Sequence, residues 1–224
     1  MSTTDPRIEL RTICRRENLL LTDGELDQLA AYVDALLDWN KRVNLISRRD
    51  VENIWFSQIL HCLSLLFYVD LPDGLQVLDL GSGGGLPGIP LAISRPGLRV
   101  TLLDSIRKKT QAVKSIRDTL GLANVNVVMA RAEEWGARLK PAERFDLVIA
   151  RAVAPLADIV RWARPLLRSG FTPQLIAYKG GDLSAEVAQA KLKGRVSSIK
   201  EVPVAFEGSL EIGLEEKKLV LVNF

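Results

Sequence analysis

Val77-Leu78-Asp79-Leu80-Gly81-Ser82-Gly83-Gly84-Gly85-Leu86-Pro87-Gly88 carries an apolar run directly into a turn dense in glycine. A short apolar run bounded by glycine is typical of a buried strand, and proline suits the first turn of a helix. Glycine allows positive φ and leaves no Cβ between the backbone and a ligand. We therefore predict a strand over Gln76–Leu80, a helix over Gly88–Ile93, and a ligand bound at the turn between them.

Strand-like and helical segments alternate after this junction. The further strands are expected over Arg99–Asp104, Val125–Ala130, Phe145–Ala150 and Gln174–Tyr178, with helices over Arg107–Leu120, near Glu133 and over Leu156–Leu167. Such alternation predicts an α/β fold with a mostly parallel sheet and right-handed crossovers. Arg195–Val204 and Lys218–Asn223 have no strong helix between them, so we predict a C-terminal antiparallel hairpin that completes seven strands.

The first part of the chain has a helical pattern instead. Thr22 and Glu25 have the spacing of a capping box, at the start of a helix that we expect to end near Trp39. Two more helices are expected, over Arg7–Glu17 and Val51–Phe67. Proline and glycine punctuate the chain near residue 72. We therefore predict a helical N-terminal extension over residues 1–72 and an α/β core over residues 73–224.

Two classes of cofactor fit the glycine turn. Gly83, Gly85 and Gly88 match the G-x-G-x-x-G spacing of dinucleotide-binding proteins, although one such match is weak evidence. Asp79, Gly81 and Gly83 place the glycines directly after an acid at the strand end, which favours S-adenosylmethionine (SAM). The predicted hairpin also favours SAM, because dinucleotide domains keep a parallel sixth strand. Asp104, at the end of the next strand, would bind ribose hydroxyls in either case.

Composition and charge exclude several classes of protein. Apolar residues make up 47% of the chain and charged residues 25%, which is typical of a globular protein. The apolar runs are too short to cross a bilayer. The two cysteines, Cys14 and Cys62, lack the spacing of a disulfide framework or a metal site. We expect a cytoplasmic monomer that binds neither metal nor membrane.

Basic residues gather in two short segments, although the net charge is only +3. A charge run is often just a solvated face, so this pattern permits an RNA partner without requiring one. The candidate RNA-binding residues are Lys41, Arg42, Arg48, Arg49, Arg107, Lys108 and Lys109.

A series of motifs occurs in a fixed order from about Leu37 to Val222. They are Trp39-Asn40, Val43-Asn44-Leu45, His61, the Gly-Leu-Pro-Gly-Ile-Pro run at 85–90, Leu102-Leu103-Asp104-Ser105, Ala132-Glu133-Glu134, Ala150-Arg151-Ala152 and Tyr178-Lys179-Gly180. In these motifs the sequence resembles the bacterial methyltransferase G family, formerly called the glucose-inhibited division protein B family. The resemblance implies a Rossmann-like, SAM-dependent enzyme that makes 7-methylguanosine in 16S ribosomal RNA, with that RNA or the small ribosomal subunit as its partner.

The resemblance also implies the residues of the site. SAM contacts are expected at Gly81, Leu86, Ala132, Glu133 and Arg151, with Asp104 near the ribose. The glycine turn adds Asp79 and Gly83 to this set. Arg151 and Lys179 each follow a strand at the edge where open α/β sheets bind ligands, and we expect both to be catalytic.

The chain departs from the family pattern around its single histidine. Leu60 and Ser64 stand where the family usually has an arginine and an aspartate. His61 lies in an apolar helical segment, so a core position and a role at the edge of the substrate site are both open.

The expected chemistry needs little from the enzyme beyond alignment. The N7 lone pair of guanine lies in the base plane, so no proton has to leave before the methyl group is attacked. The sequence lacks the Pro-Cys nucleophile of 5-methylcytosine chemistry and the Asn/Asp-Pro-Pro-Tyr motif of exocyclic-amine methylation. Two alternatives remain, namely a SAM-dependent enzyme for a small molecule or protein, and an NAD-type nucleotide-binding protein.

Overall fold

The computed structural model describes residues 5–224 and confirms the predicted Rossmann-like sheet. Seven strands lie in the order β3-β2-β1-β4-β5-β7-β6. The first five are parallel, and β7 runs antiparallel to both β5 and β6. The strands are β1 (Gln76–Leu80), β2 (Arg99–Asp104), β3 (Val125–Met129), β4 (Leu147–Arg151), β5 (Leu175–Gly180), β6 (Ser198–Pro203) and β7 (Lys217–Asn223).

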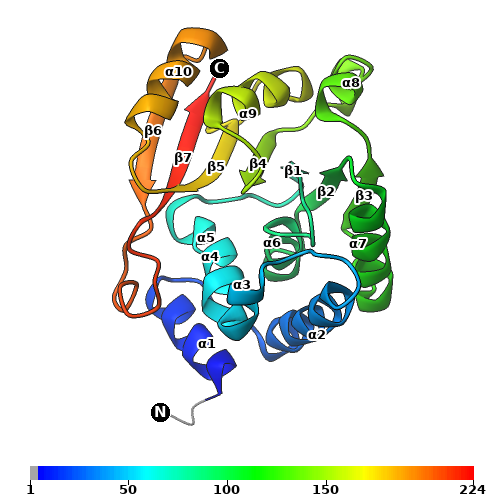
Figure 1. The fold of residues 1–224 in the computed structure, drawn as a ribbon, viewed down its shortest axis with the longest axis vertical. Helices are drawn as coiled ribbons and strands as arrows, with labels where there is room; N and C mark the ends of the chain where they lie inside the picture. Colours follow the sequence, from blue (N-terminus) through cyan, green and yellow to red (C-terminus); the bar gives the residue numbers. More distant parts are fainter. Residues whose placement is uncertain (1–4) are drawn as a thin grey trace.

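Helices cover both faces of the sheet (Figure 1). On one face lie α6 (Gly88–Ser94) and α7 (Arg107–Leu120). On the other lie α8 (Ala132–Gly136), α9 (Leu156–Ala163) and α10 (Ser184–Gly194), with short 3₁₀ helices at Pro141–Glu143 and Arg164–Leu166. The sequence pattern did not predict α10. Its residues are good helix formers, but only Ala190 and Gly194 are fully buried, so its apolar stripe is weak.

The N-terminal helices lie on the same face as α6 and α7 (Figure 1). They are α1 (Pro6–Arg16), α2 (Asp23–Asn40), α3 (Arg48–Glu52), a π-helix (Trp55–Leu60), α4 (His61–Leu63) and α5 (Leu65–Tyr68). The capping box is confirmed, because Thr22 and Glu25 each accept a hydrogen bond from the other's backbone N–H. None of the described helices is long and apolar enough to cross a membrane.

The helical stretch predicted over Val51–Phe67 is confirmed, but the structure divides it into four short pieces. The π-helix widens one turn, and such turns are frequent at functional sites. Directly after it, the Ser64 hydroxyl donates to the carbonyl of His61 over 2.8 Å. A serine that bonds the backbone in this way competes with regular helix geometry.

The N-terminal helices and the sheet share one hydrophobic core. Buried side chains from Leu10 to Leu65 belong to the same apolar cluster as those of β1, β2, α6 and α7. Helix α2 packs against α6 and α7, and the Tyr32 hydroxyl donates to the carbonyl of Gly84 in the glycine turn over 3.0 Å. The helical extension therefore holds the turn from behind, while the domain boundary near residue 72 stays a prediction.

Candidate active site

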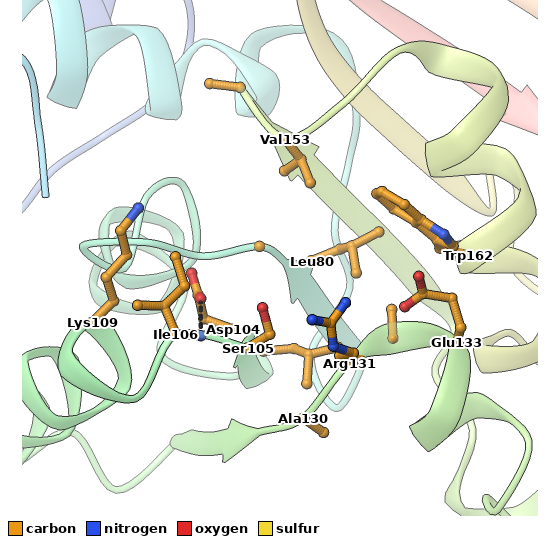
Figure 2. A pocket seen from close by; sticks show the side chains of 14 residues that line it. Leu80, Asp104, Ser105, Ile106, Lys109, Ala130, Arg131, Glu133, Val153 and Trp162 are labelled. Carbon is orange, nitrogen blue, oxygen red and sulfur yellow. Dashed lines mark hydrogen bonds between the residues drawn. The ribbon is translucent and has the colours of Figure 1, made fainter.

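The carboxyl ends of β1, β2 and β4 meet where the strand order reverses, with β1 between β2 and β4. Open α/β sheets bind ligands at such a point. A cavity of about 320 Å³ lies there and is called here the switch-point cavity (Figure 2). Its lining comes from the ends of these strands and from the segment after β3, and includes Leu80, Gly81, Leu103, Asp104, Ala130, Ala132, Glu133, Ala152 and Val153.

Four of the predicted cofactor residues line this cavity, namely Gly81, Asp104, Ala132 and Glu133. The Asp104 carboxylate accepts the backbone N–H of Gly83 over 3.0 Å and that of Ile106 over 2.8 Å. A carboxylate has about four acceptor positions, so two remain for hydroxyl donors of a ligand. Gly83 therefore supports the cavity by holding Asp104, although its own atoms do not line the cavity.

Of the three remaining predicted cofactor residues, Arg151 lines a second cavity, whereas Asp79 and Leu86 lie behind the turn. Asp79 is fully buried, and its Oδ2 accepts the backbone N–H of Gly88 over 2.8 Å, while its Oδ1 has no hydrogen-bond partner. Burial raises the pKa of this carboxyl to about 7, against the opposing effect of the Gly88 hydrogen bond. Leu86 is buried in the hydrophobic core. Cofactor contacts of Asp79 and Leu86 stay predictions.

The glycine turn is held tightly against its neighbours. The backbone N–H groups of Gly81 and Ser82 both donate to the carbonyl of Leu103, over 2.8 and 3.0 Å. Gly81 has φ of 71°, and a Cβ there would lie 2.8 Å from a methyl group of Val153. A side chain at this position would therefore both strain the backbone and push Val153 out of place.

Trp162 is a lining residue that the sequence pattern missed. It comes from α9 and lies with Glu133 at the end of the cavity opposite Lys109 (Figure 2). Its indole Nε1 is buried without a hydrogen-bond partner. A buried N–H without an acceptor is costly, so the ring is held at the cavity by its packing and not by a hydrogen bond. No sequence signal marks it, because a tryptophan in an amphipathic helix usually packs in the core.

A second, larger cavity adjoins the first at Ala152, which lines both. This space of about 950 Å³ is called here the Arg151 cavity. It brings together the predicted residues Arg49, Arg151 and Lys179 with His61, and further lining residues come from the segment between β6 and β7. Segments far apart in the sequence thus converge at one edge of the sheet.

The guanidinium of Arg151 is held by two side chains from the helical extension. It donates to Gln58 Oε1, and its Nη1 lies 3.3 Å from His61 Nδ1. Because a guanidinium can only donate, Nδ1 must accept and the histidine proton must sit on Nε2. That Nε2 is buried without a partner. His61 is therefore both buried and part of the cavity wall.

Burial lowers the pKa of His61 to about 3, and the positive charges of Arg151 and Lys217 act in the same direction. The neutral ring accepts from Arg151 without repelling it. The ring of Tyr178 also contacts His61 edge-on, with centroids 5.3 Å apart. The Tyr178 hydroxyl in turn donates to the carbonyl of Cys62 over 2.7 Å, which ties β5 to α4.

Lys179 lies in the same cavity wall but already has partners. Its ammonium donates to the carbonyl of Ala154 over 2.8 Å and to Glu186 Oε2 over 2.7 Å. An ammonium has three donors, so one remains. Its predicted catalytic role stays a prediction.

The seven predicted RNA-binding residues lie directly after α2, at the start of α3 and in the first turn of α7. All are exposed except Lys109, which is partly buried and lines the switch-point cavity. Lys41 and Arg42 pair with Asp38 over 3.5 and 2.9 Å. Arg49 lines the Arg151 cavity, whereas Arg48, Arg107 and Lys108 line neither cavity. Within residues 5–224, no cluster of three or more histidine, cysteine or acidic side chains could hold a metal ion.

Solved structures with a similar fold are distant in sequence. Fibrillarin from Aeropyrum pernix, crystallised with natively bound S-adenosyl-L-methionine, superposes with a TM-score of 0.53 at 17% identity and covers 75% of each chain. A protein of Agrobacterium tumefaciens described as a predicted O-methyltransferase gives a TM-score of 0.54 at 17% identity, over 74% of this chain and 79% of that one. These likenesses support the fold.

Sequence relatives are much closer. The ribosomal RNA small subunit methyltransferase G of Chlorobium luteolum is 39% identical over 191 residues, which cover 85% of this chain and 77% of that protein. The protein of the same name from Pelodictyon phaeoclathratiforme is 36% identical over 221 residues, which cover 98% and 94%. A family model described as rRNA small subunit methyltransferase G matches residues 25–212. The chain therefore belongs to the rRNA small subunit methyltransferase G family.

Proposed function

We propose that this protein transfers a methyl group from SAM to N7 of a guanine in 16S ribosomal RNA. The observation that carries the proposal is the meeting of two cavities at Ala152, at the carboxyl edge of the sheet. The smaller is lined by the glycine turn, by apolar side chains and by both acidic and basic groups, among them Asp104, Glu133 and Lys109. The larger is wider and more polar, and Arg151, Lys179 and His61 line it together with several acidic side chains. With SAM in the smaller cavity and the target guanine in the larger, the methyl donor and the methyl acceptor would lie on either side of Ala152.

The switch-point cavity has the groups that an adenosyl cofactor needs. Asp104 has free acceptor positions for ribose hydroxyls, and the apolar surface of Trp162 lines the same cavity. The close approach at Gly81 leaves backbone, without a side chain, at the cavity wall. When bound, SAM supplies a methyl group on a positively charged sulfur. These residues bind and orient it, and no protein group has to react with it.

The Arg151 cavity suits a nucleotide of RNA. Arg151 has five N–H donors, of which two are used by Gln58 and His61, so the rest can meet oxygen acceptors of a base or a phosphate. A target guanine must leave its stack to reach the cofactor, because a base inside a helix is inaccessible. Orientation of the base is then the main contribution of the enzyme.

The cysteines support a direct transfer without a covalent enzyme intermediate. Cys62 is fully buried, and burial raises the pKa of its thiol to about 12. Cys14 is buried as well, and neither lines either of the two cavities. Such thiols cannot act as nucleophiles on the base. Both are free thiols, which suits a reducing compartment such as the cytoplasm. We propose that the protein acts there as a monomer.

The exposed basic residues would bind the RNA backbone. Binding through phosphate contacts weakens steeply as salt rises, with a slope of about one unit of log K per log salt for each contact. We expect Arg48→Ala, Arg107→Ala and Lys108→Ala each to lower the affinity for small-subunit RNA and to reduce that slope. Unchanged affinity and slope in all three variants would exclude these residues from the RNA interface.

The test is to incubate the purified protein with methyl-labelled SAM and unmodified small ribosomal subunits, and to identify the labelled nucleoside after digestion. We expect 7-methylguanosine from the wild type and none from Arg151→Ala. Arg138→Ala is the matched control, because Arg138 is exposed and lines neither cavity. Circular dichroism and thermal unfolding check that both variants fold. No label in RNA despite SAM binding would favour a small-molecule or protein substrate, and stabilisation by NAD instead of SAM would favour a nucleotide-binding protein.

A further inference from the structure

The loop between β4 and α9 forms the wall between the two cavities. Ala152 lines both, and Val153 lines the switch-point cavity and covers Gly81. Ala152 has φ of 54°, in the left-handed region that residues other than glycine rarely adopt. A conformation of this kind persists only where surrounding contacts impose it. The groups that hold this loop therefore decide the shape of the wall.

Lys179 supplies the hydrogen bond that holds the loop. Its ammonium donates to the carbonyl of Ala154 over 2.8 Å, and no other hydrogen bond among residues 5–224 involves residues 152–154. Only 14% of the Lys179 side chain is exposed, so the ammonium depends on these partners in place of water.

Glu186 on α10 completes the arrangement. Its Oε2 accepts from Lys179 Nζ over 2.7 Å and from the backbone N–H of Leu156 over 2.8 Å. Leu156 opens α9, and Pro155 before it provides no side-chain cap, so Glu186 caps this helix from outside. Burial raises the pKa of Glu186, but the hydrogen bonds from Lys179 and Leu156 outweigh that effect and the pKa lies below its ordinary value. The acid is thus ionised, and it binds Leu156 directly and Ala154 through Lys179.

We infer that Lys179 and Glu186 are positioning residues, which fix residues 152–156 and so set the place of the methyl donor relative to the acceptor base. The pair acts through the wall and does not touch the RNA. The consequence for catalysis rests on the proposed function, whereas the effect on the loop itself does not.

The test compares Lys179→Met, Glu186→Ala and the double variant with two controls, Lys191→Met and Glu134→Gln, whose side chains are exposed outside both cavities. We expect each single variant to lower kcat about 10- to 100-fold, as small misplacements of reactants do. KM for small-subunit RNA and the salt slope of RNA binding should stay at wild-type values. The double variant should be no slower than the slower single variant, because both changes remove one shared interaction. Glu186→Gln should recover part of the loss, since its amide oxygen can still accept from Leu156.

Two results would overturn the inference. One is wild-type kcat in Glu186→Ala. The other is a Lys179→Met variant that loses RNA affinity and about one unit of salt slope while Glu186→Ala does not, which would mean that Lys179 contacts a phosphate.

A measurement without RNA separates this inference from the proposed function. In Glu186→Ala the Leu156 amide should exchange with solvent faster than in the wild type, and SAM affinity, measured by calorimetry, should fall. If the wild type makes no 7-methylguanosine, the proposed function fails, yet faster exchange at Leu156 would still support the role of the pair in the wall. Unchanged exchange at Leu156 would overturn that role.

Discussion

The charge state of His61 makes the structure testable by pH. His61 is the only histidine of the chain, and burial beside Arg151 lowers its pKa from 6.5 to about 3. In the unfolded chain the ring takes up a proton below pH 6.5, but in the folded protein it stays neutral. His61 therefore contributes stability above pH 6.5, and this contribution is lost progressively as the pH falls toward 3.

The size of the effect follows from the two pKa values. One unit of pKa difference corresponds to about 1.4 kcal/mol, so lowering the pH from about 7.5 to about 5 should cost about 2 kcal/mol of unfolding free energy through His61. Asp79 acts in the opposite direction, because burial raises its pKa to about 7. The wild type alone therefore shows only the sum, and a variant is needed to isolate His61.

The perturbation is His61→Asn, whose amide oxygen lies near the place of Nδ1 and can still accept from Arg151. Urea unfolding of both proteins at about pH 7.5 and about pH 5 gives the free energies. The difference between wild type and variant should shift by about 2 kcal/mol between the two conditions, with the wild type losing more on acidification. Parallel NMR spectra should show the single histidine ring of the folded wild type unchanged over this range.

Equal pH dependence in the two proteins, together with a histidine resonance that titrates near pH 6.5, would refute this reasoning. It would mean that water or a counter-charge reaches the ring. The neutral acceptor proposed for Arg151 would then be wrong as well.

Three further substitutions test the glycine turn, the Tyr32 hydrogen bond behind it, and the ion pair of Arg168 with Asp146 at the start of β4. Gly81→Ala should weaken SAM binding at least about tenfold in calorimetry, because positive φ and the contact at 2.8 Å both oppose a side chain; wild-type affinity would show that the turn can yield. Tyr32→Phe should lower the free energy of urea unfolding by about 1–3 kcal/mol, since the carbonyl of Gly84 loses its buried partner; an unchanged midpoint would mean that this bond adds nothing. Arg168→Gln should lower Tm at neutral pH but little at about pH 2.5. Burial raises the pKa of Asp146, but the hydrogen bonds from Arg168 and from a backbone N–H outweigh burial and lower it. The stability that this pair gives is therefore present while Asp146 is ionised and is lost as the pH falls through its pKa. Equal Tm losses at both pH values would contradict it.

Local patterns were enough to predict the sheet. The strand at Gln76–Leu80 and the helix at Arg107–Leu120 lie where they were expected, because apolar period and turn residues act within a few positions of the chain. The π-helix at Trp55–Leu60 and helix α10 were not foreseen. The π-helix departs from the 3.6-residue period by which helices are recognised in a sequence, and α10 buries too few apolar side chains to give a clear period.

The sequence by itself thus determined the parallel sheet, its glycine turn, the antiparallel hairpin and the positions of Asp104 and Arg151 at strand ends. These features depend on neighbours in the chain. Only the tertiary structure decided that Gln58 and His61 hold Arg151, that Glu186 binds Lys179, and that Trp162 faces the switch-point cavity. Each of these contacts joins elements distant in the sequence, and side-chain partners at such separations are set by how helices pack on the sheet, which no local period encodes.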